Sequence, residues 1–202
     1  MIRTIITSIC ILTLLSCTSD DYSKPKPRAY PRIDFPERSI DTFRSEDCPF
    51  TFQFMSYGKV EKRTEYFDRE PLHPCWFDIV LPDLDGRIHF SYVPVNSTEH
   101  FDKLVADAFK LSSKHNVKAN YIDEMTFKNE NDVSGMVFDL QGPVASPFQF
   151  YATDSTDHFL RASLYLNTKV RPDSLAPIYA FLKEDITLIL NSLEWKTGDP
   201  EK

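Results

Sequence analysis

The sequence predicts an α+β domain in which a mainly antiparallel β-sheet is flanked by helices. Several short segments alternate apolar and polar residues, as half-buried strands do, and turn-forming residues separate them. Two longer segments, near 96–116 and 174–193, repeat apolar residues at helical spacing. Because the strands follow one another in hairpins instead of alternating with helices, a parallel doubly wound sheet is excluded.

The chain opens with an export leader. Arg3 precedes an apolar run over residues 5–15, which is shorter than the roughly 20 residues that span a bilayer and is typical of a secretory signal. The run ends in LLSC, the spacing of a bacterial lipoprotein box. We therefore expect a signal peptide at 1–16 and lipidation of Cys17. The alternative is an ordinary signal peptide with a chance cysteine.

The residues after Cys17 bear on the location of the anchored protein. Thr18 stands where an aspartate usually retains lipoproteins in the inner membrane. The tripeptide SDD at 19–21 resembles the acidic tag that marks surface export in lipoproteins of the Bacteroidota. The outer membrane is therefore the expected location, and the sequence leaves the leaflet open.

A proline-rich segment, SKPKPRAYPRIDFP at 23–36, belongs to a predicted tether over residues 17–47. Its prolines exclude a helix interior and a central strand, and they favour an extended polyproline II conformation. The tether is either a plain spacer or a strip that docks into an aromatic-lined, acidic groove of a partner. The docking hypothesis assigns partner binding to Arg28, Tyr30, Arg32 and Phe35.

A single folded domain is expected over residues 48–196, followed by a polar tail at 197–202. Its first strand lies near 49–54, where three phenylalanines alternate with polar residues and share one face. Strands at 75–82 and 87–93 then form a hairpin around the turn sequence PDLDG. In the second of these strands, His89 is interpreted as part of the polar face, opposite the apolar face of Ile88, Phe90 and Tyr92.

A helix is predicted after this hairpin. Asn96 is the expected cap, with Glu99 three residues later completing a capping box, and the helix should end near His115. The predicted apolar face consists of Phe101, Leu104, Val105, Ala108, Leu111 and Ser112.

Four more strands and a second helix complete the domain. The strands are expected at 118–127, 135–141, 148–153 and 159–166. Ser174 is the expected cap of the second helix, which places Pro177 in the first turn, where its missing N–H has no consequence. The apolar face of this helix consists of Leu175, Ile178, Phe181, Leu182, Ile186, Ile189 and Leu193.

The stretch from Asp154 to His158 collects two aspartates, a serine, a threonine and a histidine. It lies where a hairpin must reverse, and these residue types form turns by bonding nearby backbone. A serine nucleophile would need His158 within about 3 Å and a third group to orient it. We expect a hairpin turn here; a binding surface and a catalytic site are the alternatives.

Composition argues against several classes of site. The formal net charge of −7 argues against nucleic acid as a partner. The histidines lack metal-binding spacing, and the glycines are not clustered into a loop that could cradle phosphate. We therefore expect no catalytic residue, no metal and no cofactor.

Cys48 and Cys75 are the cysteines left once Cys10 is removed with the leader and Cys17 is acylated. In an oxidising compartment two such thiols favour a disulfide. Two free, buried thiols are the alternative.

Several motifs occur in order along the chain. They are PKPRAYPRIDFP, CPFTF, PCWFDIVLP, RIHFSY, ASPFQFYATDSTDHFLRASLYLN and DSLAPIYAFLKEDI. With the lipoprotein box at Cys17, they resemble the gliding-motility lipoprotein family GldD of the Bacteroidota across essentially the whole mature chain. The departures are local: Ala29 stands where the family usually has glycine, and MSYG at 55–58 replaces a proline-containing stretch.

This resemblance implies a non-enzymatic accessory of gliding motility and type IX secretion that works beside other lipoproteins or ring components. The order of elements also resembles a Mog1/PsbP-like α/β/α sandwich, which is an analogy at the level of the fold. The rival hypothesis is a small-ligand or glycan-binding module, or a hydrolase, at the cell envelope. A pocket in which His89, Asp154 and His158 converge would favour that rival, whereas a flat aromatic and basic patch would favour scaffolding.

Overall fold

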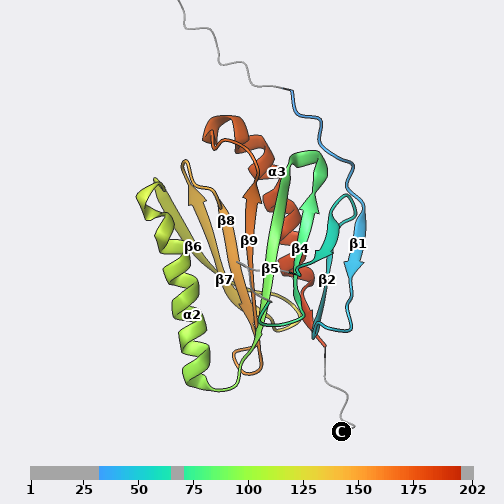
Figure 1. The fold of residues 1–202 in the computed structure, drawn as a ribbon, viewed down its shortest axis with the longest axis vertical. Helices are drawn as coiled ribbons and strands as arrows, with labels where there is room; N and C mark the ends of the chain where they lie inside the picture. The colour runs from blue at the N-terminus through green and yellow to red at the C-terminus, as the bar shows by residue number, and fades with distance from the viewer. Residues whose placement is uncertain (1–31, 65–70, 197–202) are drawn as a thin grey trace, which may run out of the picture. The chain divides into compact units, whose positions relative to one another are not determined.

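The computed structural model describes residues 32–64 and 71–196. The predicted signal peptide at 1–16 and polar tail at 197–202 lie outside the described residues. Within them, the strands form a seven-stranded and a three-stranded sheet, and neighbouring strands are antiparallel (Figure 1). The predicted α+β class with a mainly antiparallel sheet is confirmed.

The large sheet carries a row of polar residues on one of its faces. Its spatial order is β3 (Lys59–Lys62), β4 (Trp76–Leu81), β5 (Gly86–Pro94), β9 (His158–Leu166), β8 (Phe148–Thr153), β7 (Ser134–Gln141) and β6 (Tyr121–Lys128). The register places Asp78, His89, Ser163 and Gln149 in one row across β4, β5, β9 and β8. Directly opposite residues on neighbouring strands share a face of the sheet, so these four side chains leave the sheet on the same side.

The small sheet shows that the folded part begins before residue 48. Its central strand β2 (Phe50–Met55) pairs with β1 (Ile40–Phe43) on one side and with β10 (Glu194–Trp195) on the other. Phe43 is buried and stacks on Phe52 and Phe77 at 4.8 and 4.4 Å between ring centroids. The predicted boundary missed β1 because a four-residue strand with two apolar residues carries little periodicity.

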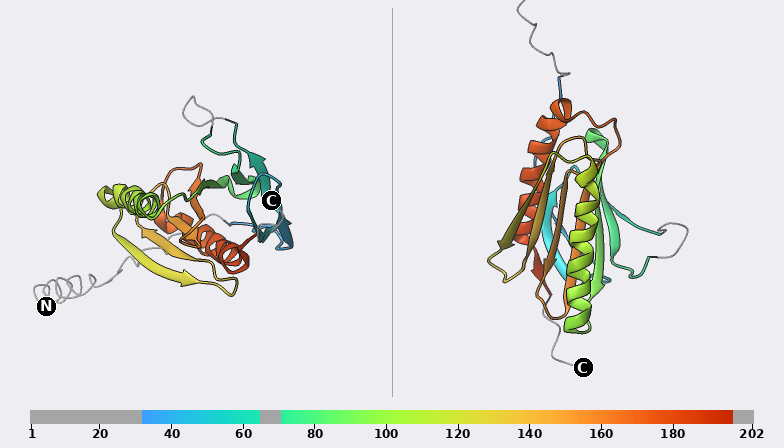
Figure 2. Two further views of the ribbon diagram at one scale, coloured as in Figure 1. Left: turned by 90° about the horizontal axis from the view of Figure 1, so that it is seen from below. Right: turned by 90° about the vertical axis from the view of Figure 1, so that its left-hand side faces the viewer.

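Two α-helices in the described part of the chain cover opposite faces of the large sheet (Figure 2). Helix α3 (Pro172–Ser192) packs with β2 against the face that carries Phe90, Phe150 and Leu164. Helix α2 (Thr98–Ser113) packs on the other face, against Phe138, Tyr151 and Phe159. Neither helix is long and apolar enough to cross a membrane.

Both helix starts differ from the prediction. Ser97 caps α2, since its hydroxyl accepts the His100 N–H at 3.1 Å, so the expected capping box of Asn96 and Glu99 is absent. Helix α3 begins at Pro172, two residues before the predicted cap Ser174, and Pro177 lies inside the helix. A proline at the first helical position is preorganised for the helix, and this outweighed the hydroxyl of Ser174 as a start signal.

Candidate functional site

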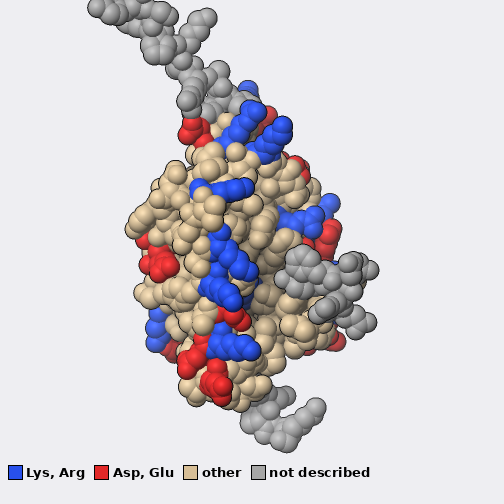
Figure 3. Space-filling model, turned by 60° about the vertical axis from the view of Figure 1, so that its left-hand side comes forward, with Lys and Arg blue, Asp and Glu red and all other residues tan. Residues whose placement is uncertain are grey.

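A cleft of ≈ 1120 Å³ lies between α2 and the large sheet. It exists because α2 packs on residues of β7, β8 and β9, while no helix of the described residues covers the same face of β4 and β5. Figure 3 brings the α2 side of the molecule forward and shows Lys and Arg side chains following one another down the middle of this side. We take this cleft as the candidate functional site.

The charges in the cleft are mostly positive. Among the described residues that line it, the carboxylates are Asp78 and Asp107. The cationic lining residues are Lys62, Arg63, Arg87, Lys114 and Arg161. The cleft is therefore locally cationic, although the chain as a whole has a formal net charge of −7.

Apolar side chains line the cleft beside these cations. Helix α2 contributes Leu104 and Leu111, which are partly exposed, and the sheet contributes Trp76 and Phe159. The indole N–H of Trp76 donates to the Tyr92 carbonyl at 2.8 Å, which fixes the orientation of the ring. The site thus offers positive charge and apolar surface side by side.

Asp78 is the centre of an ion-pair cluster on the cleft floor. Its carboxylate contacts Arg63 at 2.6 Å, His89 Nδ1 at 2.7 Å and Arg87 at 3.4 Å. Burial disfavours ionisation of Asp78, but the hydrogen bonds and charges of His89 and Arg63 outweigh burial and lower the pKa of its carboxyl. Asp78 is therefore an ionised group that holds the side chains of Arg63, Arg87 and His89 in place at neutral pH.

The same row contains a serine, a histidine and an aspartate, which are the residue types of a catalytic triad. Ser163 lies opposite His89 in the strand register, and His89 contacts Asp78. Between these described residues, however, no hydrogen bond joins Ser163 to His89. Arg63 also pairs with Asp78 and contacts His89 Nδ1. A triad base instead bonds the nucleophile and is oriented by a carboxylate of its own, so the row has the geometry of an ion-pair cluster.

The stretch from Asp154 to His158 forms the turn between β8 and β9, as predicted. Asp154 Oδ1 accepts the backbone N–H groups of Thr156, Asp157 and His158 at 3.0, 2.9 and 2.9 Å. Burial raises the pKa of Asp154, but these bonds outweigh burial and lower it. The side chain of Asp154 therefore organises the turn.

His158 belongs to the opposite face of the large sheet. Its Nδ1 is hydrogen-bonded to the Tyr92 hydroxyl at 2.7 Å, and its ring stacks on Trp195 at 4.8 Å. Tyr92 packs in the core on the α3 side, whereas His89, three residues earlier in β5, lines the cleft. The convergence of His89, Asp154 and His158 that would have favoured a hydrolase or ligand-binding module is therefore not found.

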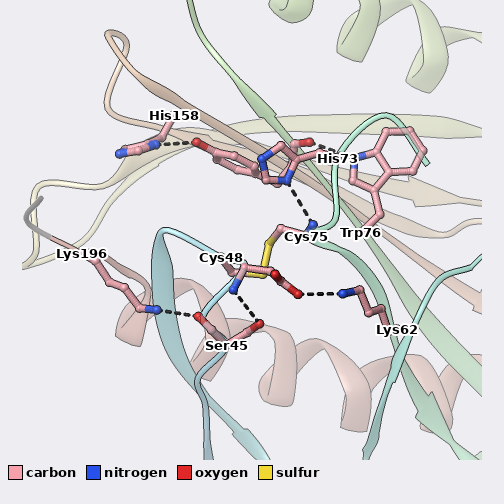
Figure 4. The surroundings of a disulfide bond; sticks show 10 residues. Ser45, Cys48, Lys62, His73, Cys75, Trp76, His158 and Lys196 are labelled. Atoms are coloured by element: carbon pink, nitrogen blue, oxygen red, sulfur yellow. Dashed lines mark hydrogen bonds and ion pairs between the residues drawn. A yellow bond between two sulfur atoms is a disulfide. The ribbon is translucent and has the colours of Figure 1, made fainter. Parts of the chain in front are cut away.

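Cys48 and Cys75 form a disulfide, with an S–S distance of 2.01 Å and Cα atoms 5.2 Å apart (Figure 4). Both residues are buried, and they join the start of β2 to the start of β4. His73 Nδ1 accepts the Cys75 N–H at 3.0 Å beside the bond. The disulfide thus ties the small sheet to the large one.

The tether residues lie only in part within the described structure. Cys17, Arg28 and Tyr30 lie outside it. Arg32 pairs with Asp34 at 3.0 Å, and both side chains are largely exposed. Phe35 stacks on Phe181 of α3 with ring centroids 4.5 Å apart and remains 39% exposed. One of the predicted partner-binding residues therefore contacts the protein's own domain.

A second contact holds the same segment on α3. The Arg38 guanidinium lies 4.1 Å from the centroid of the Phe181 ring and pairs with Asp185 at 2.8 Å and with Glu184 at 2.5 Å. The Tyr57 hydroxyl also donates to Asp185, which is buried. The sequence does not predict this cluster, because its members come from three distant segments and none of these segments carries a local motif that indicates the contacts.

The cleft residues were also missed, because they are dispersed over several elements. The available signal was weak: the strand pattern predicts His89 on a polar face, but nothing in the sequence indicates that α2 leaves this face uncovered. In the part of the chain that the structure describes, no group of three or more His, Cys, Asp and Glu side chains could hold a metal ion.

Comparisons with known proteins point to one family. A family model described as gliding motility lipoprotein GldD matches residues 20–195. Among solved structures, the solution structure of cyanobacterial PsbP (CyanoP) from Synechocystis sp. PCC 6803 aligns over 79% of this chain and 94% of its own, with 8% identity and a TM-score of 0.46. The comparison with curated proteins found no match.

Proposed function

Because the chain belongs to the GldD family of gliding motility lipoproteins, we propose that it is a non-enzymatic, lipid-anchored accessory component of the gliding and type IX secretion apparatus. Its proposed work is to bind and stabilise partner lipoproteins or ring components of that apparatus. The observation that carries the proposal is the family match over residues 20–195, which covers the described domain up to Trp195.

The proposed anchor is a lipid on Cys17, and the proposed location is the outer membrane. The lipoprotein box before Cys17 and the SDD tripeptide after it support both statements. Two acyl chains on one cysteine would hold the protein firmly to a bilayer. The net negative charge argues against nucleic acid as a partner.

Two features of the site support a binding role over catalysis. The polar side chains around Asp78 are engaged with one another, since its carboxylate contacts Arg63, His89 and Arg87. The acidic and hydroxyl groups of the β8–β9 turn are used in the turn itself, where Asp154 accepts three backbone N–H groups.

A pull-down from outer membranes after mild crosslinking tests the proposal. The bait is the full-length lipoprotein with an affinity tag at its C-terminus, and the captured proteins are identified by mass spectrometry. We expect lipoproteins or ring components of the gliding and secretion machinery to be enriched over a mock bait, another tagged outer-membrane lipoprotein. Equal recovery with both baits would contradict a scaffolding role.

A ligand-binding module is the second candidate function, and the cleft favours it. Sites for small molecules or glycans are concave and combine apolar walls with a few polar groups, as this cleft does. The two candidates predict different ligands for the same surface.

A further inference from the structure

We infer that the cleft between α2 and the large sheet binds an acidic peptide segment of a partner protein, with the peptide carboxylates against the cleft cations and its apolar side chains against Trp76 and Leu104. The inference rests on the proposed function, because it specifies the chemistry by which a partner is held.

Charge complementarity is the first argument. Among the described residues, the cleft lining has five Lys and Arg side chains against two carboxylates, Asp78 and Asp107. Of the two, Asp78 already contacts Arg63, His89 and Arg87. One of the five cations, Lys62, is paired at 2.7 Å with Asp47, which lies outside the lining. An acidic ligand would complement the cationic lining of the described part of the cleft, and the positive charge there would attract it although the chain as a whole is acidic.

The distribution of the cations favours an extended ligand over a single small anion. Arg87 comes from β5, Arg161 from β9, and Lys114 from the residue after α2. A site for one phosphate group would bring its donors to one point. The cleft volume of ≈ 1120 Å³ also exceeds the range of about 300–1,000 Å³ that is typical of small-molecule pockets.

The apolar lining favours a peptide over a membrane surface. Leu104 of α2 packs on the cluster that contains Phe159, and both residues line the cleft together with Leu111 and Trp76. Apolar surface therefore accompanies the cations in the lining. A bilayer surface approaches a flat or convex basic face and cannot enter a cleft between a helix and a sheet. A peptide that alternates acidic and apolar residues can contact the cationic and the apolar side chains of the cleft at the same time.

A buried donor lies next to the cleft cations. Gln149 is 2% exposed, and its Oε1 accepts from Arg161 at 3.1 Å. Its Nε2 has no protein partner among the described residues. A buried amide donor without a partner is costly, and an acceptor that enters beside Arg161 would lower that cost.

The direct test is a binding measurement on the full-length lipoprotein in detergent micelles. The probe is a fluorescent peptide that alternates glutamate with leucine and phenylalanine, and binding is followed by fluorescence anisotropy. We expect saturable binding that weakens as salt is raised, because exposed charge pairs are screened. A peptide with lysine in place of every glutamate should not bind. Absent binding of the acidic peptide, or equal binding of the lysine peptide, overturns the inference.

A matched pair of double variants tests the place of binding. Arg87→Ala with Lys114→Ala removes two cleft cations, whereas Lys103→Ala with Lys169→Ala removes two exposed cations that do not line the cleft. Both double variants remove two positive charges. A difference in their affinity for the acidic peptide therefore shows that the position of the removed cations matters. We expect the cleft variant to lose about tenfold or more in affinity and the control to stay within about twofold.

Equal losses in the two double variants would mean general charge attraction and would overturn the inference. Lys114→Ala alone serves as a further variant, since Lys114 is exposed and its removal leaves the Asp78 cluster intact. We expect a smaller loss of affinity for it, with an unchanged circular dichroism spectrum. An affinity equal to wild type would contradict the place assigned to the ligand.

Two competitors and one pull-down separate the remaining outcomes. Displacement of the peptide by millimolar inorganic phosphate or by phosphatidylglycerol vesicles would show a general anion site and overturn the peptide assignment. If the Arg87→Ala and Lys114→Ala bait captures the same envelope partners as wild type, the inference fails and the proposed function stands. If the wild-type bait captures no such partner, the proposed function fails. The anisotropy measurement then still decides whether the cleft binds an acidic peptide.

Discussion

Asp78 shows how one residue organises a surface. It lies in β4 between two apolar neighbours, and its carboxylate holds Arg63, His89 and Arg87 on the cleft floor. Its pKa is lowered, because contacts with His89 and Arg63 outweigh the effect of burial. The residue therefore links the local electrostatics of the cleft to the stability of the sheet.

Asp78→Asn should lower the free energy of unfolding at pH 7 by about 3 kcal/mol, because it leaves a largely buried guanidinium without its counter-ion. The substitution should also flatten the acid limb of the stability curve. A carboxyl with a lowered folded pKa adds stability above its unfolded pKa of about 3.9, and this stability is lost as pH falls through the folded pKa. Urea unfolding at several pH values measures both effects.

The control for this prediction is Asp102→Asn, an exposed position of α2. It should change stability by less than about 0.5 kcal/mol. If Asp78→Asn and the control gave the same curves, the ion-pair cluster would contribute nothing measurable.

Ser155 and His158 offer the second prediction at this scale. Replacing both by Ala should leave gliding and secretion intact, because their surroundings are those of a turn and of a core edge. Stability should fall by about 1 kcal/mol, since the hydrogen bond between His158 and Tyr92 is lost. Colony spreading and thermal unfolding are the measurements, and a folded, abundant but non-motile variant would show that the turn has a direct role.

At the scale of elements, two connections hold the small sheet and the chain before it. The Cys48–Cys75 disulfide joins β2 to β4, and the contacts of Phe35 and Arg38 with Phe181 hold the segment before β1 on α3. Both connect segments that lie far apart in the sequence. Together they fasten the described segments before β1 and before β2 to the rest of the domain.

Replacing Cys48 and Cys75 together by Ala should lower the free energy of unfolding by about 3 kcal/mol, because the bond closes a loop over a sequence separation of 27 residues. The corresponding fall in Tm is about 10 °C for a domain of this size. Thermal unfolding of both proteins, with and without a reductant, measures it. Reductant should lower the Tm of wild type alone; equal Tm values without reductant would contradict the prediction.

The tether prediction separates a spacer from a docking strip. Changing Arg28, Tyr30, Arg32 and Phe35 to Ala should abolish colony spreading while the domain stays folded and membrane-attached, since buried aromatics and paired arginines act as interface anchors. Replacing 23–36 by a neutral proline-rich linker of equal length should have the same effect if side chains matter, and none if only reach matters.

The contact between Phe35 and Phe181 requires a separate control for this test. Phe35→Ala alone removes the intramolecular stacking, so its effect on stability can be subtracted from that of the fourfold change. Normal spreading of the fourfold variant, at wild-type protein level, would leave the spacer hypothesis.

At the scale of the whole molecule, the domain presents two different faces. The α3 face of the large sheet is closed by α3 and β2, whereas the α2 face is covered only in part and forms the cationic cleft. Under the proposed function, this cationic cleft is the surface that would hold a partner.

The anchor itself gives the last prediction. Cys17→Ala should leave the protein unprocessed and unlipidated, because the acceptor thiol is gone. Globomycin, which blocks cleavage at lipoprotein boxes, should shift the mobility of wild type to that of the variant. Electrophoretic mobility and metabolic labelling with a fatty acid are the measurements. Wild type and variant of equal mobility, with and without globomycin, would rule out the lipoprotein box.

Much of the fold could be predicted because the local spacing of apolar residues indicates the strands and helices. Alternation over 87–93 and 159–166 and helical spacing after residue 174 reflect burial on one face of each element. The turn at Asp154 was predictable for the same reason, since its acceptors and donors lie within four residues. The family followed from ordered motifs along the whole chain.

The sequence by itself determined the α+β class, the turn between β8 and β9, and membership of a lipoprotein family. Only the tertiary structure decided that β1 joins the domain and that Phe35 and Arg38 contact α3. It also decided that Arg63, Arg87 and Arg161 line one cleft. These contacts join residues far apart in sequence, and they depend on how α2 and α3 pack on the sheet, which no local period encodes.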